Sequence, residues 1–290
     1  KVIVSQTLHP ESLACLKTYL INTDLEPVTV PWKNGAADME TIAGLLDDET
    51  ACVIAQTPNF FGVIEPMEKL SEMAHAIGAL LVVSVDPISL GLLASPGEYE
   101  ADIVVGEGQS LGLPMNMGGP SLGFLATRKK FARQIPGRLV GRTVDHHGKA
   151  CFCLTLQTRE QHIRREKATS NICTNEGLMT VRAMLYLSLV GAAGLKEVAR
   201  LCAAKAHYLA EGLSQIKGFG VRYAAPFFKE FVLECDQDAD RVLARVAKHG
   251  ILGGVPMARF YPQMSNRLLV AVTEKRTRAE LDAFIAAVSQ

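Results

Sequence analysis

The chain has 290 residues, of which 48% are hydrophobic, and this is enough to fill the core of one large domain and a small one. Thirty basic and thirty acidic residues cancel, which argues against a protein that grips nucleic acid or an anionic lipid surface. The longest apolar runs, such as Ala79 to Val85, are far shorter than the roughly 20 residues that a membrane-spanning helix needs, so we expect no membrane segment.

The first half of the chain, up to Leu156, alternates short β-branched runs with amphipathic stretches. Apolar strands separated by helices are typical of a mostly parallel sheet with helices on both faces, so we predict an α/β domain. In chain order we expect strands over 2–5, 27–30, 52–56 and 80–85, and helices over 11–20, 38–46 and 65–77. The opening run Lys1 to Ser5 reads as a buried strand, which indicates that the sequence continues from a larger protein.

The pattern changes after Leu156 to a long helical periodicity, which predicts helices over 174–190 and 195–216. Gly218 ends the second of these helices. Beyond it we expect strands over 220–223, 230–234 and 267–272, and helices over 238–248 and 278–288. We therefore divide the chain into a large α/β domain, residues 1–190, and a long helix with a small α+β domain, residues 191–290.

Three loops at the carboxyl ends of predicted strands carry polar residues: 56–59, 84–87 and 107–114. In parallel sheets these ends meet at the binding site. Asp86 follows an apolar strand, where an ionised carboxylate is costly unless a cation faces it. A plain Asp-Pro turn or helix cap also explains Asp86 without any ligand, and we favour that interpretation.

Two other motifs are weak. Gly106 to Gly112 reads G-x-G-x-x-x-G, not the dinucleotide fingerprint G-x-G-x-x-G, and Pro114 leaves no room for the helix that should follow. His146-His147 with Cys151 and Cys153 has the wrong spacing for a common zinc site. Gly148 and Lys149 between them read as a hairpin tip that leads into a strand over 151–156. We expect neither a hydride site nor a metal.

The segment 159–175 leaves two interpretations open. Arg159, Arg164, Arg165 and Lys167 fit a charged, solvated helix followed by a polar cap. The hydroxyls and amides of residues 169–175 also fit a phosphate cradle at a helix start. In the small domain, Lys229 and Arg259 fit carboxylate binding, but nothing in the sequence separates this from surface pairing.

Seven cysteines, an odd number, are scattered among apolar neighbours. This distribution favours free thiols in a reducing compartment over a disulfide framework, so we expect a cytoplasmic protein.

Residues 101–114, followed by Gly118-Gly119-Pro120, resemble the cofactor-lysine segment of pyridoxal-phosphate enzymes of the aspartate aminotransferase fold. In that segment an Ala-Asp strand leads through a His-Lys pair to a glycine-rich loop. Here Gly108-Gln109 stands where the His-Lys pair would be. A glutamine amide is not a nucleophilic amine, so Gln109 cannot form the Schiff base that anchors this cofactor.

Further segments make the chain similar to one family, the glycine cleavage system P-proteins, or glycine dehydrogenases (decarboxylating). Within it, the likeness is to the first subunit, the alpha chain of the two-chain prokaryotic form. The segments that carry it are 59–62, 86–91, 106–114, 136–141, 155–165 and 167–175. The likeness covers essentially all of the chain and lacks the family's amino-terminal portion, consistent with the abrupt start at Lys1.

The resemblance implies a pyridoxal-phosphate-dependent transferase fold, fold type I, with a large α/β domain and a small α+β carboxyl-terminal domain. It also implies a complex of two alpha and two beta chains, in which glycine dehydrogenase subunit 2 holds pyridoxal phosphate. This complex decarboxylates glycine and passes the aminomethyl group to the lipoyl H-protein. The present chain would bind no cofactor alone and would complete and support the partner's site.

Under this resemblance the chain carries no catalytic residue of its own, since Gln109 occupies the lysine position. The candidates for a vestigial cofactor site, or for contact with the partner's site, are Asp86, Ser110, Gly118, Gly119, Thr169, Ser170, Asn171, Thr174 and Asn175. Two other classes stay open: an independent pyridoxal-phosphate enzyme that uses another lysine, the nearest being Lys69 and Lys129, and a purely structural or regulatory protein.

Overall fold

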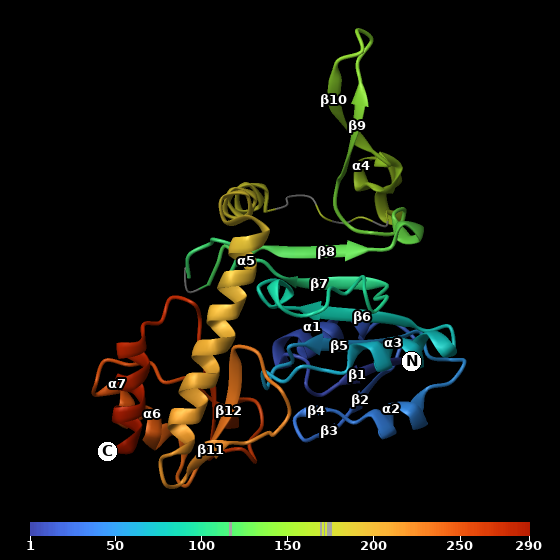
Figure 1. The fold of residues 1–290 in the computed structure, drawn as a ribbon. Helices are drawn as coiled ribbons and strands as arrows, with labels where there is room; N and C mark the ends of the chain where they lie inside the picture. Colours follow the sequence, from blue (N-terminus) through green and yellow to red (C-terminus); the bar gives the residue numbers. More distant parts are fainter. Residues whose placement is uncertain (116–117, 169, 171, 173–175) are drawn as a thin grey trace.

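The computed structural model describes residues 1–115, 118–168, 170, 172 and 176–290. Its centre is a six-stranded sheet of order β2-β1-β5-β6-β7-β8, parallel except for β8, which pairs antiparallel with β7 (Figure 1). The strands are β1 (Val2–Ser5), β2 (Pro27–Val30), β5 (Cys52–Thr57), β6 (Leu80–Val85), β7 (Ile103–Glu107) and β8 (Gly123–Thr127). A short ribbon, β3 (Trp32–Lys33) with β4 (Ala36–Ala37), follows β2. The predicted α/β sheet is confirmed.

Helices pack on both faces of this sheet, because successive side chains of a strand point to opposite sides. Val2 and Val4 of β1 pack with Leu13 of α1, whereas Ile3 between them belongs to the cluster that includes Leu70 of α3. Each such buried side chain stabilises the fold by roughly 1.5–3 kcal/mol. The helices of this domain are α1 (Pro10–Leu20), α2 (Met39–Leu45) and α3 (Met67–Ala76), close to the predicted ranges.

One long helix, α5 (Gly177–Ser214), contains a break at Gly191, whose φ of 59° and ψ of −175° are not helical. Glycine adopts positive φ without a steric penalty, so the helix changes direction there. Figure 1 shows the first part of α5 almost end-on above the long second part. The break lies between the two helices predicted over 174–190 and 195–216, so the predicted division into two helices is confirmed.

By length and composition α5 is apolar enough to cross a membrane, which corrects the expectation that no described segment could pass that test. Buried core helices of soluble proteins pass it as well, but the apolar window of α5 is only 6% buried. A span needs about 20 residues without interruption, and the break at Gly191 leaves only residues 177–190 before it. After the break, Ala199, Cys202 and Leu213 are buried against the rest of the protein.

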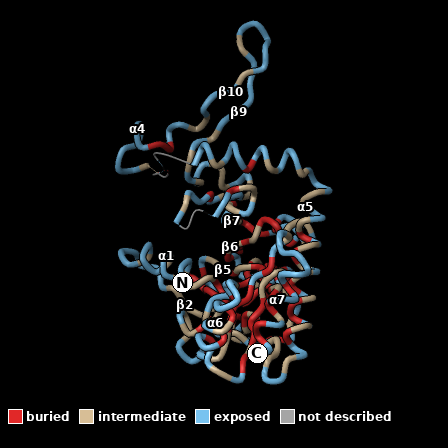
Figure 2. The backbone as a smooth tube through the Cα atoms, turned by 90° about the vertical axis from the view of Figure 1, so that its left-hand side faces the viewer, coloured by how far each residue is buried: buried red, intermediate tan, exposed pale blue. Residues whose placement is uncertain are grey.

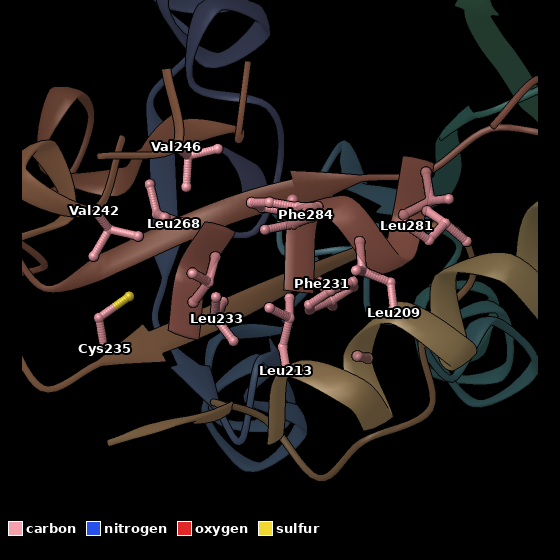
Figure 3. Packing of buried hydrophobic residues seen from close by; sticks show 14 of the residues in the cluster. Leu209, Leu213, Phe231, Leu233, Cys235, Val242, Val246, Leu268, Leu281 and Phe284 are labelled. Carbon is pink, nitrogen blue, oxygen red and sulfur yellow. The ribbon is translucent and has the colours of Figure 1, made fainter. Parts of the chain in front are cut away.

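The small domain is a four-stranded antiparallel sheet of order β11-β12-β14-β13, packed against α5, α6 and α7. Its elements are β11 (Phe219–Val221), β12 (Glu230–Cys235), α6 (Ala239–Ala247), β13 (Val255–Pro256), β14 (Arg267–Ala271) and α7 (Arg278–Ser289). Figure 3 shows Leu209 and Leu213 of α5 meeting Phe231 and Leu233 of β12 in this core. The predicted α+β character of this region is confirmed.

The two sheets are joined by an aromatic cluster. Phe61, which is fully buried, stacks edge-on against Trp32 and lies within ring contact of Tyr223 and Tyr261. At Gly62, which has φ of 81°, a Cβ atom would overlap the backbone carbonyl of Glu230. The backbone of the large domain thus lies directly against Glu230, the first residue of β12 in the small domain, and only glycine allows this approach.

A hairpin of β9 (Leu139–Val144) and β10 (Ala150–Thr155) extends away from the body (Figures 1 and 2). Its turn is held by the Asp145 carboxylate, which accepts hydrogen bonds from the backbone N–H groups of His147 and Lys149. The hairpin tip predicted at Gly148 and Lys149 is confirmed. Phe152 is 73% exposed on this hairpin.

Candidate functional site

Gln109 lies in the loop that follows β7, at the carboxyl end of the parallel sheet. The Glu107 carboxylate organises this loop by accepting hydrogen bonds from the backbone N–H groups of Gln109, at 2.9 Å, and Leu122, at 2.7 Å. The side-chain amide of Gln109 donates to the Pro114 carbonyl at 3.3 Å. The Gln109 amide therefore links the two ends of the loop 109–114, and it offers no amine for a Schiff base.

The same loop packs tightly on α5. Gly112 has φ of 87°, and a Cβ atom there would lie 2.7 Å from Cβ of Tyr186. Arg182 donates from Nε to the Gly112 carbonyl at 2.8 Å. Glycine is required at this position by both the conformation and the close approach.

Asp86 follows β6 and uses its two carboxylate oxygens in different ways. Oδ1 accepts a hydrogen bond from the Ile88 backbone N–H at 3.0 Å, which is the predicted Asp-Pro turn. Oδ2 lies 2.6 Å from Nζ of Lys229, and both side chains are less than one-fifth exposed. A cation therefore does face Asp86, and it comes from the small domain of the same chain.

The sequence alone does not decide whether Lys229 binds a carboxylate ligand or pairs with a surface residue; in the structure it pairs with Asp86. Burial alone would lower its pKa, but the charge of Asp86 and the hydrogen bond to it outweigh burial and raise the pKa. The amine is thus protonated at neutral pH and is a poor nucleophile. The sequence signal for this ion pair is the position of Lys229 between the buried Phe228 and strand β12, because a lysine in an apolar stretch needs an anionic partner.

A cavity of about 430 Å³ lies between these loops, α5 and the turn that follows β14. Gln109 and Ser110 line it from the sheet, Tyr186 and Cys202 from the two parts of α5, and Lys229 from β12's start. Burial raises the pKa of the Cys202 thiol to about 11, so this thiol is protonated and unreactive at neutral pH. Neither Lys69 nor Lys129 lines the cavity.

Asp102, the acid of the Ala-Asp strand start, has a structural role. It is 1% exposed, and its carboxylate accepts hydrogen bonds from the Leu81 backbone and meets His75 at 2.8 Å and Lys130 at 3.1 Å. Burial raises its pKa, but these partners more than offset that effect and hold the pKa below its usual value. The ionised carboxylate ties β6, β7 and the segment after β8 together.

The remaining candidate residues fall into three groups. Ser110 is exposed at the cavity, whereas Gly118 and Gly119, with φ of 141° and 112°, do not line it. Ser170 is 1% exposed, and its hydroxyl oxygen accepts a hydrogen bond from the Gly137 backbone at 3.0 Å. The other four, Thr169, Asn171, Thr174 and Asn175, lie outside the described residues, so the phosphate cradle stays a prediction.

Arg159 corrects the expectation of a solvated charged helix. It is 5% exposed and donates hydrogen bonds to the carbonyls of Ile135, Gly137 and Leu156. Three carbonyls satisfy the guanidinium and hold the base of the hairpin to the segment before α5. Around it the chain forms only short helical pieces, among them α4 (Gln161–Arg164), with Arg164, Arg165 and Lys167 exposed as expected.

Gln109, Asp86 and Lys229 therefore lie at one end of the sheet, where Gln109 carries no amine and the amine of Lys229 is paired with Asp86. The family model described as the glycine cleavage system P-protein matches residues 1–288. The chain belongs to this family.

Relatives and a solved structure of the family cover 98–100% of the chain. The proteins named "Probable glycine dehydrogenase (decarboxylating) subunit 1" from Desulfitobacterium hafniense and Carboxydothermus hydrogenoformans are 49% and 51% identical over 100% and 98% of it. The chain spans 65% and 64% of those two proteins. A crystal structure of glycine decarboxylase (P-protein), in inhibitor-bound form, superposes with a TM-score of 0.94 at 44% identity, covering 99% of this chain and 64% of that one.

More distant structures establish the fold alone. A cysteine desulfurase from Escherichia coli, 14% identical, superposes with a TM-score of 0.76 over 99% of this chain and 70% of that one. A NifS-like protein, 16% identical, gives 0.72 over 100% and 74%. The predicted fold, that of pyridoxal-phosphate-dependent transferases of fold type I, is confirmed.

Proposed function

We propose that this chain is part of subunit 1 of a two-subunit glycine dehydrogenase (decarboxylating). With subunit 2 it decarboxylates glycine and delivers the aminomethyl group to the lipoyl arm of the H-protein. The observation that carries this proposal is the family membership, and it is supported by Gln109, which stands where the sequence resemblance places the cofactor lysine.

Pyridoxal phosphate is assigned here to subunit 2, in a complex of two alpha and two beta chains. The cofactor supplies the electron sink for loss of CO2. Two features of this chain do not fit cofactor binding: Gln109 lacks the amine, and Lys229 already neutralises Asp86, the carboxylate suited to a pyridinium nitrogen. Its own part is to shape and support the partner's site, in a complex that we place in the cytoplasm.

Lys229 argues against the alternative of an independent pyridoxal-phosphate enzyme. This lysine lies in the cavity close to Asp86, but the ion pair with Asp86 keeps its amine protonated and so a poor nucleophile. Leaving this chain out of the reaction distinguishes the proposed function from a purely structural role. Glycine decarboxylation by subunit 2 and H-protein should fall to background without this chain. Unchanged decarboxylation in its absence would overturn the proposed function.

Full-length subunit 1 titrated with pyridoxal phosphate should develop no internal Schiff-base absorbance, because Gln109 has no amine and Lys229 is held protonated by Asp86. The measurement is absorbance followed by borohydride reduction and peptide mapping, with subunit 2 as the positive control. A reduced adduct mapped to Lys229, or to a lysine beside the Gln109 loop, would contradict the assignment of the cofactor to subunit 2.

The surface that we assign to subunit 2 is the first part of α5. Leu178 and Leu189 are 76% and 86% exposed there, with Val181, Met184 and Leu185 exposed between them. So many apolar side chains on one exposed helix mark an interaction surface in a soluble protein. The exposed first part of α5 and the hairpin lie toward the same end of the molecule (Figure 2).

Replacing Leu189 with glutamate should weaken association of full-length subunit 1 with subunit 2 by about tenfold or more, because a charge would be buried without a partner. Sedimentation of the mixed subunits measures this. Leu252→Glu is the matched control, since Leu252 is 96% exposed in the small domain, far along the chain from α5's first part. Equal association of both variants would contradict the assigned surface.

A further inference from the structure

The cavity beside Gln109 is lined by more positive than negative groups. Its basic residues are Arg182, Lys229, Lys275 and Arg276, and its acidic residue is Glu274. Asp86, outside the lining, neutralises Lys229, and Glu274 accepts a hydrogen bond from the Cys202 thiol. Counting Lys229 with Asp86, and Arg276 with Glu280 at 3.4 Å, as neutral leaves two cations, Arg182 and Lys275, against Glu274, so the lining carries a net positive charge that attracts anions.

Two of these cations have donor groups to spare. Arg182 uses only Nε, toward the Gly112 carbonyl, and faces no carboxylate within ion-pair distance among the described residues. Lys275 has no hydrogen bond or ion pair within the part of the chain that the structure describes. They come from separate elements, α5 and the turn after β14, and both line the same cavity. A guanidinium fork and an ammonium on different walls suit an oxyanion held between them.

The rest of the lining is apolar enough to receive the carbon part of a ligand. Ile88, Leu113 and Val198 line the cavity, and Ile88 and Leu113 are themselves buried. The volume of about 430 Å³ falls within the range of small-molecule sites. Ser110 and Gln109 add neutral polar groups at the sheet side.

We propose that this cavity, at the position that the cofactor would take in a lysine-bearing paralogue, binds a small oxyanion, a carboxylate or a phosphate. Arg182 and Lys275 hold the anionic oxygens, and the apolar lining holds the carbon part. The site belongs to this chain and differs from the cofactor site assigned to subunit 2. It stands whether or not the chain works in glycine decarboxylation.

The test is calorimetric titration of full-length subunit 1, alone and in complex with subunit 2, with inorganic phosphate in one arm and succinate in the other. Saturable binding is expected in at least one arm, and that arm identifies the oxyanion class. Binding should weaken with added salt, because salt screens the attraction between charges at a solvent-accessible site. If the proposed function alone fails, omitting this chain leaves glycine decarboxylation unchanged, while this titration still shows saturable binding.

Arg182→Gln and Lys275→Gln should each weaken binding about tenfold to a hundredfold, because each removes a charge-assisted contact. Both residues are exposed, so the folded state should survive, which thermal unfolding checks. Arg241→Gln and Lys248→Gln are matched controls on α6 and at its end, which contribute nothing to the cavity, and should bind as the parent does.

Three results would overturn the site. The first is no saturable binding of either anion by the chain or by the complex. The second is binding that Arg182→Gln and Lys275→Gln leave unchanged. The third is binding by the isolated chain that disappears in the complex, since another part of the assembly would then fill the cavity.

Discussion

Lys229→Met should lower the free energy of unfolding by about 2–4 kcal/mol, a large fraction of the stability of a typical domain. The lysine and Asp86 are both less than one-fifth exposed, and their charged atoms lie 2.6 Å apart. Removing the cation leaves the Asp86 carboxylate in a largely buried place without a counter-charge, which costs more than the pair itself contributed. Urea-induced unfolding of the full-length chain, followed by circular dichroism, measures the loss.

The double variant Asp86→Asn with Lys229→Met is the control that separates the cost of an unpaired Asp86 carboxylate from the loss of the lysine side chain itself. Asparagine keeps an oxygen for the Ile88 N–H, so the turn survives while both charges are gone. The double variant should therefore regain most of the stability that the single variant loses. Exposed Lys248→Met should change little. If the single and double variants are equally unstable, the ion pair does not hold the domains as described.

The pH dependence of this contribution has a definite sign. The folded-state pKa of Lys229 is raised, because the charge and hydrogen bond of Asp86 outweigh burial, which alone would lower it. A group with a raised folded pKa gives its full stabilisation below its unfolded pKa, about 10.4 for lysine, and loses it as the pH rises through the folded value. The difference between parent and Lys229→Met should thus stay constant from about pH 6 to pH 9 and shrink only in strong alkali.

Phe61→Ala should destabilise the chain by about 3–5 kcal/mol, the usual range for a phenylalanine removed from a packed core. Phe61 has no exposed surface, and its ring touches those of Trp32, Tyr223 and Tyr261. Backbone contacts that run beside it, such as Phe228 N–H to the Gly62 carbonyl, prevent the cavity from collapsing. Thermal unfolding with limited proteolysis at the domain junction measures the effect.

Phe152→Ala makes the same chemical change at a ring that is 73% exposed on the hairpin. In the isolated chain it should alter stability by no more than about 0.5 kcal/mol. A comparable loss in both variants would mean that Phe61 does not join the two domains. A loss confined to Phe61→Ala, with cleavage appearing between the domains, would show that the aromatic cluster is the joint.

Local patterns in the sequence located most elements correctly. The strands over 2–5, 27–30, 52–56 and 80–85 and the amphipathic helices between them follow from period-2 and period-3.6 spacing of apolar residues, which depends only on near neighbours. The division of α5 near Gly191 was also predicted, as two helices over 174–190 and 195–216, and the positive φ of this glycine makes the break. Arg159 was misjudged, because its charge suggested solvent and only the fold brings three backbone carbonyls around it.

The sequence by itself determined the fold class and the family, because both depend on residue identity and local order. The tertiary structure decided which groups surround Gln109 at the end of the sheet. Lys229 lies 143 residues beyond Asp86 in the chain, and only the docking of the small domain brings its ammonium to that carboxylate. Arg182 and Lys275 likewise face one cavity only after folding, since charge complementarity over such separations leaves no pattern along the sequence.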